Sequence, residues 1–393
     1  MPQTERLYYT NCYLKEFSAR IVRSEPDPRG ARVYLDRTGF YPESGGQPSD
    51  YGELAGNPLL EVVDEGEEIA HVIAEDPPFK PIHGSIDWGR RFDHMQQHTG
   101  QHILSAAFER TVGYKTVSFH LGSESATIDL DSERVGVQQI ETAEDLANQV
   151  VFENRPVQIS FRPAAEVNQL ELRKPTFREG DVRLVEIEEF DLSACGGTHV
   201  NRTGGVGMIS VRKVDRARGF TRVEFLCGGR ALRHARQDFA TLSEAARLFS
   251  TGLENVPELI AKQSRELREA GKGLQNLTED LAGLEAAQMV QAAGKNSGRV
   301  VQCLLESTES AKAKLLAHAV SKHGGVGLIG VKGTPTALFF AQPPGGKYNM
   351  ADVLKQTLAK FGGRGGGARD FAQAGGLPED QLKVALEFAE SLL

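Results

Sequence analysis

Cysteine is scarce in this chain of 393 residues, which contains only Cys12, Cys195, Cys227 and Cys303. These residues are too few and too far apart to staple a chain of this length, so we expect no disulfides and a reducing compartment. Long apolar runs are also missing, because none approaches the roughly 20 residues of a membrane helix. The N-terminus resembles neither a signal peptide nor a transit peptide. We therefore expect a globular, cytoplasmic protein of two or three domains, with no membrane partner.

A net positive charge is missing as well, because 45 Lys and Arg stand against 53 Asp and Glu, a formal net charge of −8. Phosphate contacts need clustered Lys and Arg, so this average argues against a nucleic-acid partner. The charge is uneven, however. Residues 202–236 carry nine Lys or Arg against two acids, and residues 295–369 carry eleven against three. Two basic islands on an acidic body favour a long polyanion as partner, and the alternative is a pair of solvated basic faces.

Residues 1–90 consist of short runs in which apolar and polar residues alternate, separated by Gly, Pro and Asp. Ala31–Leu35 and Leu59–Val63 are examples. Alternation with a period of two is typical of strands with one buried face. We therefore predict a small β-rich, barrel-like domain.

The period changes at Asp93, which we interpret as the N-cap of a helix over residues 94–112 that ends at Gly113. Further on, one helix is predicted over Ala143–Asn154. The strands predicted around it are Thr116–Leu121, Ala126–Leu130, Val157–Phe161, Val182–Ile187, Val206–Val211 and Thr221–Cys227. Together these elements indicate an α+β domain over residues 91–232.

Residues 233–294 lack strand patterns and carry a heptad repeat instead. Its seam consists of Ile260, Leu267, Leu274 and Leu281, with Leu277 and Leu284 at the second position. This pattern is typical of a coiled coil or a helical hairpin. Gln263, Gly271 and Gly273 interrupt the seam, so we favour an antiparallel helix pair folded at the glycines.

Residues 295–393 indicate a separate α/β domain, which makes the whole chain an α+β multidomain protein. Its predicted elements are the helices Ser310–His323, Met350–Phe361 and Glu379–Leu392, the strands Val326–Val331 and Thr336–Gln342, and a glycine-rich loop from Gly362 to Gly367.

Four residues have the spacing of a metal site. His98 and His102 are four residues apart on the predicted helix, so both imidazoles leave the same face. Cys195-Gly-Gly-Thr-His199 adds a thiolate and a third imidazole across a turn that its two glycines permit. Three nitrogens and one sulfur form a tetrahedral zinc set. His94, one turn before His98, is the competing ligand.

Four motifs, in family order, resemble one family over almost the whole chain. The segments Arg91–Ser105 and Cys195–His199 are similar to the paired metal motifs of the alanyl-tRNA synthetase editing domain and of its free-standing relatives, the alanyl-tRNA editing proteins. Asp36–Asp50 is similar to the glycine-rich motif of the family's β-barrel. Phe361–Gly376 is similar to the C-terminal DHH-associated domain of the synthetase.

The resemblance implies a zinc editing domain, with one zinc per chain, and a C-terminal domain that binds tRNA and dimerises. The match begins near residue 1 and leaves no room for an aminoacylation domain, so we expect the long free-standing form and not a synthetase. Its implied activity is hydrolysis, in trans, of the ester that joins serine or glycine to alanine tRNA. We expect a homodimer that binds tRNA and not DNA.

Zinc suits ester hydrolysis because it lowers the pKa of a bound water or polarises the carbonyl. Four protein ligands close the site, however, whereas a bound water needs an open position. Two alternatives stay open at this stage. Either Cys195 or one histidine withdraws, or zinc only shapes the pocket and the substrate's own hydroxyls activate the water.

The resemblance also implies roles for residues outside the metal motifs. It assigns to Thr38 a hydroxyl that helps to recognise serine, and the alternative is a structural residue at a strand end. Tyr41 and Gln47 are expected to line the same pocket. His120 is a candidate contact to the ester or the terminal adenosine, or else an ordinary strand histidine.

Arg364 and Arg369 flank the glycine-rich loop, where backbone amides and guanidinium groups can approach a phosphate backbone. We predict that they bind tRNA, and a flexible loop is the alternative. Two rival functions remain. Editing of serine on threonine tRNA would use similar metal motifs, and a non-catalytic tRNA-binding protein would use the zinc structurally.

Overall fold

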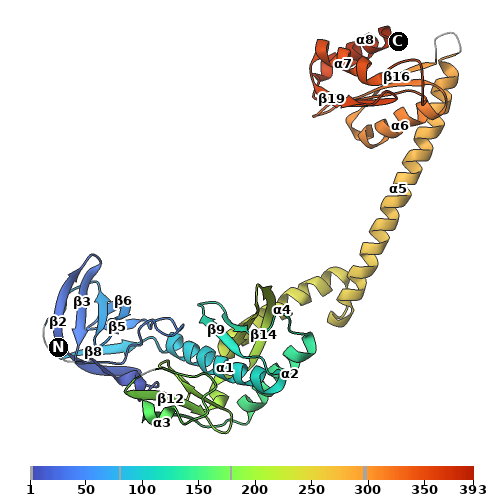
Figure 1. The fold of residues 1–393 in the computed structure, drawn as a ribbon. Coiled ribbons are helices and arrows are strands. Elements are labelled where there is room, and N and C mark those ends of the chain that lie inside the picture. Colours follow the sequence, from blue (N-terminus) through green and yellow to red (C-terminus); the bar gives the residue numbers. More distant parts are fainter. Residues whose placement is uncertain (1–2, 79–80, 178, 295–298) are drawn as a thin grey trace. The chain divides into compact units, whose positions relative to one another are not determined.

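The computed structural model describes residues 3–78, 81–177, 179–294 and 299–393 (Figure 1). They form two compact units, Met1–Glu244 and Ala245–Leu393, which we call unit 1 and unit 2. Both units mix helices and strands, so the α+β prediction is confirmed. The boundaries predicted at residues 90, 232 and 294 stay predictions. No helix among the described residues is long and apolar enough to cross a membrane.

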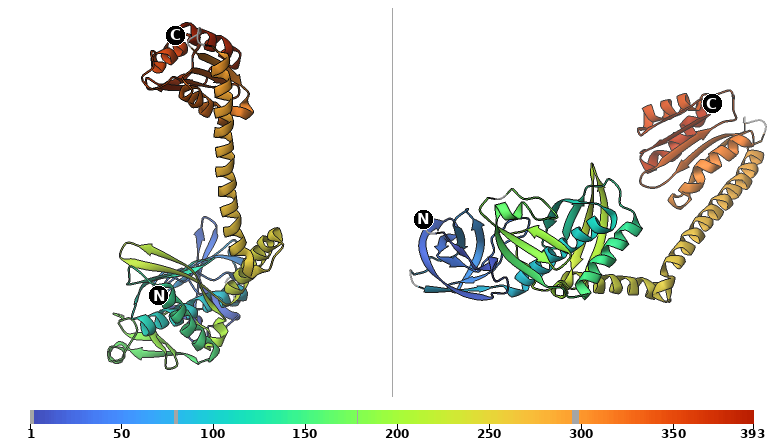
Figure 2. Two further views of the ribbon diagram at one scale, coloured as in Figure 1. Left: turned by 90° about the vertical axis from the view of Figure 1, so that its right-hand side faces the viewer. Right: turned by 60° about the horizontal axis from the view of Figure 1, so that its bottom comes forward.

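Unit 1 begins with the predicted β-barrel (Figure 2). Its strands, in spatial order, are β2 (Glu16–Asp27), β3 (Gly30–Leu35), β7 (Ile69–Ile73), β6 (Asn57–Asp64), β5 (Gly52–Leu54) and β8 (Pro81–Ile86). Alternate side chains, such as Val33 and Leu35, fill the interior. Two short strands, β1 (Glu5–Arg6) and β4 (Arg37–Thr38), pair in parallel beside it.

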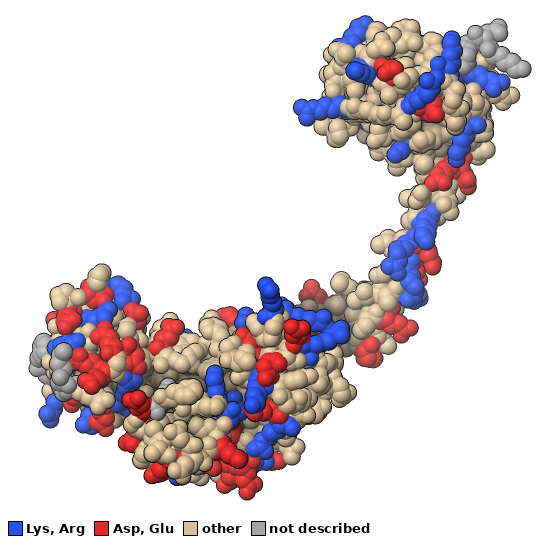
Figure 3. Space-filling view, in the orientation of Figure 1, with Lys and Arg blue, Asp and Glu red and all other residues tan. Residues whose placement is uncertain are grey.

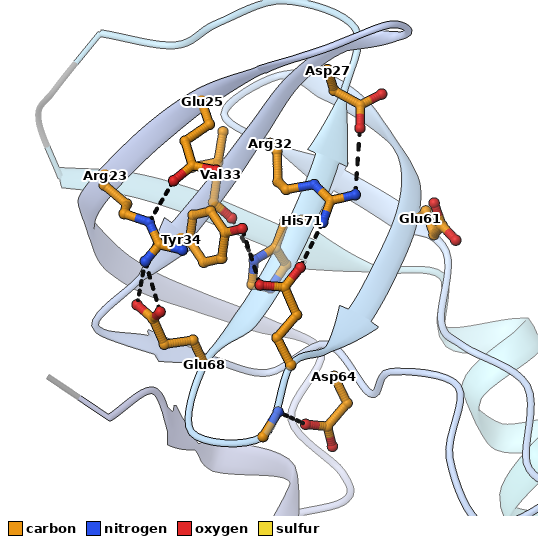
Figure 4. Close-up of polar contacts among 12 residues, drawn as sticks. Arg23, Glu25, Asp27, Arg32, Val33, Tyr34, Glu61, Asp64, Glu68 and His71 are labelled. Carbon is orange, nitrogen blue, oxygen red and sulfur yellow. Dashed lines mark hydrogen bonds and ion pairs between the residues drawn. The ribbon is translucent and has the colours of Figure 1, made fainter. Parts of the chain in front are cut away.

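Charged side chains on the barrel pair with one another (Figure 4). Arg23 donates hydrogen bonds to Glu25 and Glu68, and Arg32 lies between Asp27 and Glu65. These pairs lie at the partly exposed surface of the barrel. In them, acidic side chains of the barrel form ion pairs with arginines of the same barrel.

Helix α1 (Trp88–Val112) leaves the barrel and carries the first metal motif. The predicted N-cap, Asp93, is wrong, because the helix begins six residues earlier. Asp87 is the cap, and its side chain accepts a hydrogen bond from the Arg90 amide. Asp93 instead forms an ion pair with Arg230, which lies at the start of the helix α4 (Gly228–Phe249). The predicted end is confirmed, since Gly113 adopts the left-handed conformation.

Two antiparallel sheets surround α1. The first contains β14 (Ile209–Ala217), β15 (Phe220–Cys227), β10 (Ala126–Leu130) and β9 (Thr116–Leu121), and the second contains β11 (Val157–Pro163), β12 (Asp181–Ile187) and β13 (Asp191–Ala194). The helices α2 (Val137–Phe152) and α3 (Ala164–Val167) complete this region. The predicted strand start at Val206 is wrong, because Thr203–Val206 is a 3-10 turn. The sequence did not predict β13.

The antiparallel helix pair folded at the glycines is wrong. α4 (Gly228–Phe249) is followed by a break at Ser250, whose φ is 50°, and α5 (Val256–Ala292) runs through Gly271 and Gly273 without interruption. Glycine costs a helix interior about 1 kcal/mol relative to alanine but does not end it. The heptad leucines of α5 are exposed within unit 2.

The rest of unit 2 is a five-stranded sheet with helices on both faces. Its order is β16 (Val300–Leu305), β17 (Val326–Val331), β18 (Ala337–Ala341), β20 (Phe371–Gly375) and β19 (Arg364–Gly367). The end of α5 and α6 (Ser310–Lys322) share one core with the sheet. α7 (Met350–Phe361) and α8 (Leu382–Ser391) share the other.

One prediction for this unit is wrong, and one strand was missed. The glycine-rich segment is not a loop, because Arg364–Gly367 pairs with β20 as an edge strand; added Cβ atoms at Gly365 and Gly367 would overlap that neighbour. Strand β16 was not expected. Lys295, the first residue of the second basic island, lies outside the described residues.

Candidate metal centre

The four predicted ligands converge inside unit 1. One ligand atom each of His98, His102, Cys195 and His199 lies within 4.8 Å of the others. The Cys195 Sγ atom is 3.4 Å from His98 Nε2 and 3.2 Å from His199 Nε2. Two ligands come from one face of α1, and two come from the loop that follows β13. The predicted convergence is therefore confirmed.

A separate hydrogen bond orients each imidazole. His98 Nδ1 donates to Gln47 Oε1 at 2.8 Å, and His102 Nδ1 donates to Asp191 Oδ2 at 3.0 Å. His199 Nδ1 lies 3.1 Å from the hydroxyl of Thr99. Because all three Nδ1 atoms are engaged, the three Nε2 atoms remain for a metal. Metal-binding histidines are commonly held in this way.

Asp191 is a residue of the candidate site that the sequence analysis missed. Its carboxylate also accepts hydrogen bonds from Arg173 Nε at 2.6 Å and Ser193 Oγ at 3.0 Å. Burial alone would raise the pKa of Asp191, but the His102 hydrogen bond and the charges of His102 and Arg173 outweigh it and lower this pKa. Alternation along the strand that precedes Cys195 could have revealed this aspartate, had that strand been recognised.

The donor set fits zinc. Burial would raise the pKa of the Cys195 thiol, but His98 and His199 more than compensate, so this pKa lies well below its usual range and the thiolate is favoured. Three imidazole nitrogens and one thiolate are a tetrahedral zinc combination. His94 is not part of the group: its Nδ1 atom is buried without a hydrogen-bond partner, and burial lowers its pKa to about 4.

Gly197 allows the ligand loop to approach α1. A Cβ atom at this position would overlap the His98 imidazole and lie 3.0 Å from Gln47 Oε1. The glycine predicted to permit a turn therefore has a second role, since it makes room for a ligand.

A cavity of about 430 Å³ lies beside the four residues, and the side chains of His98, His102 and Cys195 form part of its wall. Tyr41 lines the cavity as predicted, and its hydroxyl donates to the Ser44 carbonyl at 3.0 Å. Arg173 and the segment after it form another part of the wall. A metal held by the cluster would therefore be accessible to a small ligand.

The structure places three predicted residues elsewhere. Thr38 is buried against the barrel, where its hydroxyl is 2.8 Å from His71 Nε2 and accepts a hydrogen bond from the Phe40 amide. His120 is exposed on β9. Neither residue belongs to the described lining of the cavity. Gln47 does not belong to the described lining either, and its Oε1 atom accepts the hydrogen bond that orients His98.

Arg364 and Arg369 lie in unit 2. Arg364 begins β19 and is exposed, and Arg369 donates to the Gly346 carbonyl at 3.2 Å. Lys and Arg side chains are visible on both units (Figure 3). Several basic residues of the first island are paired with acids, Arg212 with Asp238 and Arg222 with Asp129 among them.

Comparison with known proteins agrees with these features. Residues 182–224 match the family described as the threonyl and alanyl tRNA synthetase second additional domain. The alanine–tRNA ligase of Pyrococcus abyssi is 32% identical over 420 residues, which cover all of this chain and 44% of the ligase. The chain therefore spans less than half the length of that relative.

A relative of matching length decides the family. The alanyl-tRNA editing protein AlaX-L of Pyrococcus horikoshii is 30% identical over 410 residues, which cover 99% of both chains. This chain belongs to the AlaX-L family. The resemblance on which the sequence analysis relied is thereby confirmed. Among solved structures, the C-Ala domain of Aquifex aeolicus alanyl-tRNA synthetase matches 24% of this AlaX-L family member and 89% of that domain, with 23% identity and a TM-score of 0.23.

Proposed function

We propose that this AlaX-L family member is a trans-editing aminoacyl-tRNA deacylase that hydrolyses the ester of tRNA(Ala) mischarged with serine or glycine. The observation that carries the proposal is the cavity beside the preorganised His98, His102, Cys195 and His199 set. A purely structural zinc would not need an opening to its ligands. This opening therefore argues against the non-catalytic alternative.

A zinc ion held by these residues would polarise an ester carbonyl or lower the pKa of a bound water. The protein's own residues fix the geometry around it. Gln47, Thr99 and Asp191 hold the three imidazoles in place, so the ligands need no reorganisation. Tyr41 and the segment after Arg173 enclose the space where the aminoacyl ester would lie.

The test is hydrolysis of tRNA(Ala) charged with serine, glycine or alanine by the purified protein, with tRNA(Thr) charged with serine in parallel. We expect about one zinc per chain and turnover of the first two substrates. The double variant His98→Ala/His102→Ala should lose both zinc and activity, because metal affinity depends on the complete ligand set. Zinc is measured by elemental analysis. Stoichiometric zinc at this site in the double variant, or no hydrolysis by the wild type, would contradict the proposal.

We further propose that unit 2 binds tRNA and supports a homodimer. The exposed heptad leucines of α5 support the dimer. Arg364 in β19 and Arg369 just after it support the contact with tRNA. A truncated protein of residues 1–244 should still hydrolyse substrate at high concentration but bind tRNA more weakly.

The salt dependence of this affinity should also become shallower, because fewer phosphate contacts release fewer counterions. Titration of labelled tRNA at several salt concentrations measures both quantities. If the full chain and residues 1–244 show equal affinity and equal salt dependence, unit 2 does not contribute phosphate contacts.

A further inference from the structure

Gln101 has an unusual environment in the cavity wall. It lies on α1 between His98 and His102, is 2% exposed and lines the cavity. Its Nε2 atom donates a hydrogen bond to Ser105 Oγ at 2.9 Å, but its Oε1 atom is buried without a hydrogen-bond partner. Buried polar groups are almost always paired, so a buried amide oxygen without a partner, on a residue of the cavity wall, indicates a missing hydrogen-bond donor.

Rotation of the Gln101 amide does not remove this unpaired position. The rotation would exchange the oxygen and nitrogen, and one of them would still face away from Ser105. Ser105 is itself engaged by the Thr116 hydroxyl at 2.8 Å, and Thr116 also lines the cavity. Gln101, Ser105 and Thr116 thus form a series of hydrogen-bonded side chains, in which one atom of the Gln101 amide still has no partner.

The other buried side-chain atom without a hydrogen-bond partner among the described residues does not compete for this role. It is His94 Nδ1, and His94 does not belong to the described lining of the cavity. Thr38, to which the resemblance assigns serine recognition, already uses its hydroxyl on His71 and the Phe40 amide. Gln101 is therefore the residue of the cavity wall whose buried side-chain oxygen a ligand could pair.

We propose that Gln101 is the residue that distinguishes seryl from alanyl substrates, by a hydrogen bond between its side-chain amide and the serine hydroxyl. This inference rests on the proposed deacylase function. A bound alanyl group would leave the Gln101 side-chain oxygen unpaired. Sites that must bury an unpaired polar group discriminate far more strongly than apolar pockets of similar size.

The test compares three variants. Gln101→Met retains the length of the side chain and removes the amide. Gln96→Met is a matched control on the same helix, since Gln96 pairs with the Gly205 carbonyl and the Gly229 amide outside the cavity. Thr38→Val removes the rival hydroxyl and retains its shape. Zinc content and melting temperature are measured for each variant.

Hydrolysis of Ser-, Gly- and Ala-tRNA(Ala) gives the selectivity. Gln101→Met should lower kcat/KM for Ser-tRNA(Ala) at least about tenfold and narrow its advantage over Ala-tRNA(Ala), with zinc retained. The values for glycine and alanine should change little, because neither has a hydroxyl. Gln96→Met should leave the serine-to-alanine ratio unchanged. An unchanged ratio in Gln101→Met, or a ratio that falls only in Thr38→Val, would overturn the proposal.

A binding experiment separates this inference from the deacylase function. Seryl and alanyl groups joined to 3′-amino-3′-deoxyadenosine by an amide cannot be hydrolysed as esters. By calorimetry, the wild type should prefer the seryl compound, and Gln101→Met should lose that preference. If the wild type hydrolyses no charged tRNA but shows this preference, the deacylase proposal fails and the role of Gln101 in recognition remains. If the wild type binds both compounds equally, the role of Gln101 is refuted.

Discussion

Replacement of Gly197 by alanine is expected to weaken zinc binding strongly while the rest of unit 1 stays folded. The added methyl group would occupy the space of the His98 imidazole, and it would also crowd the Gln47 oxygen that orients this imidazole. Loss of a supporting contact alone typically lowers metal affinity 10- to 100-fold. Because Gly197→Ala displaces a ligand as well, we expect a loss of more than about 100-fold.

Zinc affinity is measured by competition with a chromogenic chelator, and folding by circular dichroism. Gly136→Ala is a suitable control, since the nearest atom to its added Cβ would be 3.5 Å away, at ordinary contact distance. It should bind zinc like the wild type. Wild-type zinc affinity in Gly197→Ala would show that the ligand loop and α1 need not approach so closely.

The second large effect is expected from Arg91→Met, which should destabilise unit 1 by about 3–5 kcal/mol. Arg91 is fully buried at the junction of α1 and the barrel. Its guanidinium pairs with the equally buried Asp50 and donates to the carbonyls of Cys12 and Gly39 at 3.1 and 2.7 Å. Removal of the cation would leave the Asp50 carboxylate buried without its counter-charge.

Thermal or urea unfolding measures this loss. Arg29→Met is the control, because Arg29 forms its ion pairs on the exposed surface of the barrel, where such pairs contribute little. The double variant Arg91→Met/Asp50→Leu should recover part of the stability, since it removes both charges. A single Arg91→Met variant as stable as the wild type would show that this ion pair is dispensable for docking α1 onto the barrel.

The sequence predicted which four residues converge as candidate metal ligands, because metal binding requires specific residue types at specific spacings. His98 and His102 had to share a helix face, and Cys195 and His199 needed a glycine turn. Strand limits such as Thr116–Leu121 and Val326–Val331 were also predicted to the residue, because glycines lie close to both ends of each strand.

Residues whose roles depend on tertiary contacts could not be predicted in this way. Asp191 has no motif of its own, and its role follows from the pairing of β13 beside α1. Thr38 lies within a recognisable motif, yet the barrel encloses its hydroxyl. The glycines of α5 were misinterpreted because helix propensity is a weak tendency that a long helix overcomes. Gln101 became a candidate for substrate recognition only when the structure showed that its buried side-chain oxygen has no hydrogen-bond partner.

The sequence positions of the Arg91 partners and of the four candidate metal ligands also set the order in which these contacts can form during synthesis. All barrel strands lie before residue 87, and the three partners of Arg91 precede it in the sequence. The barrel can therefore capture the start of α1 while the ribosome is still producing the second half of unit 1. The set of four candidate metal ligands is complete only when His199 has been added, more than one hundred residues after Arg91. At about 5–20 residues per second, the two histidines of α1 wait at least about five seconds for the other two ligands.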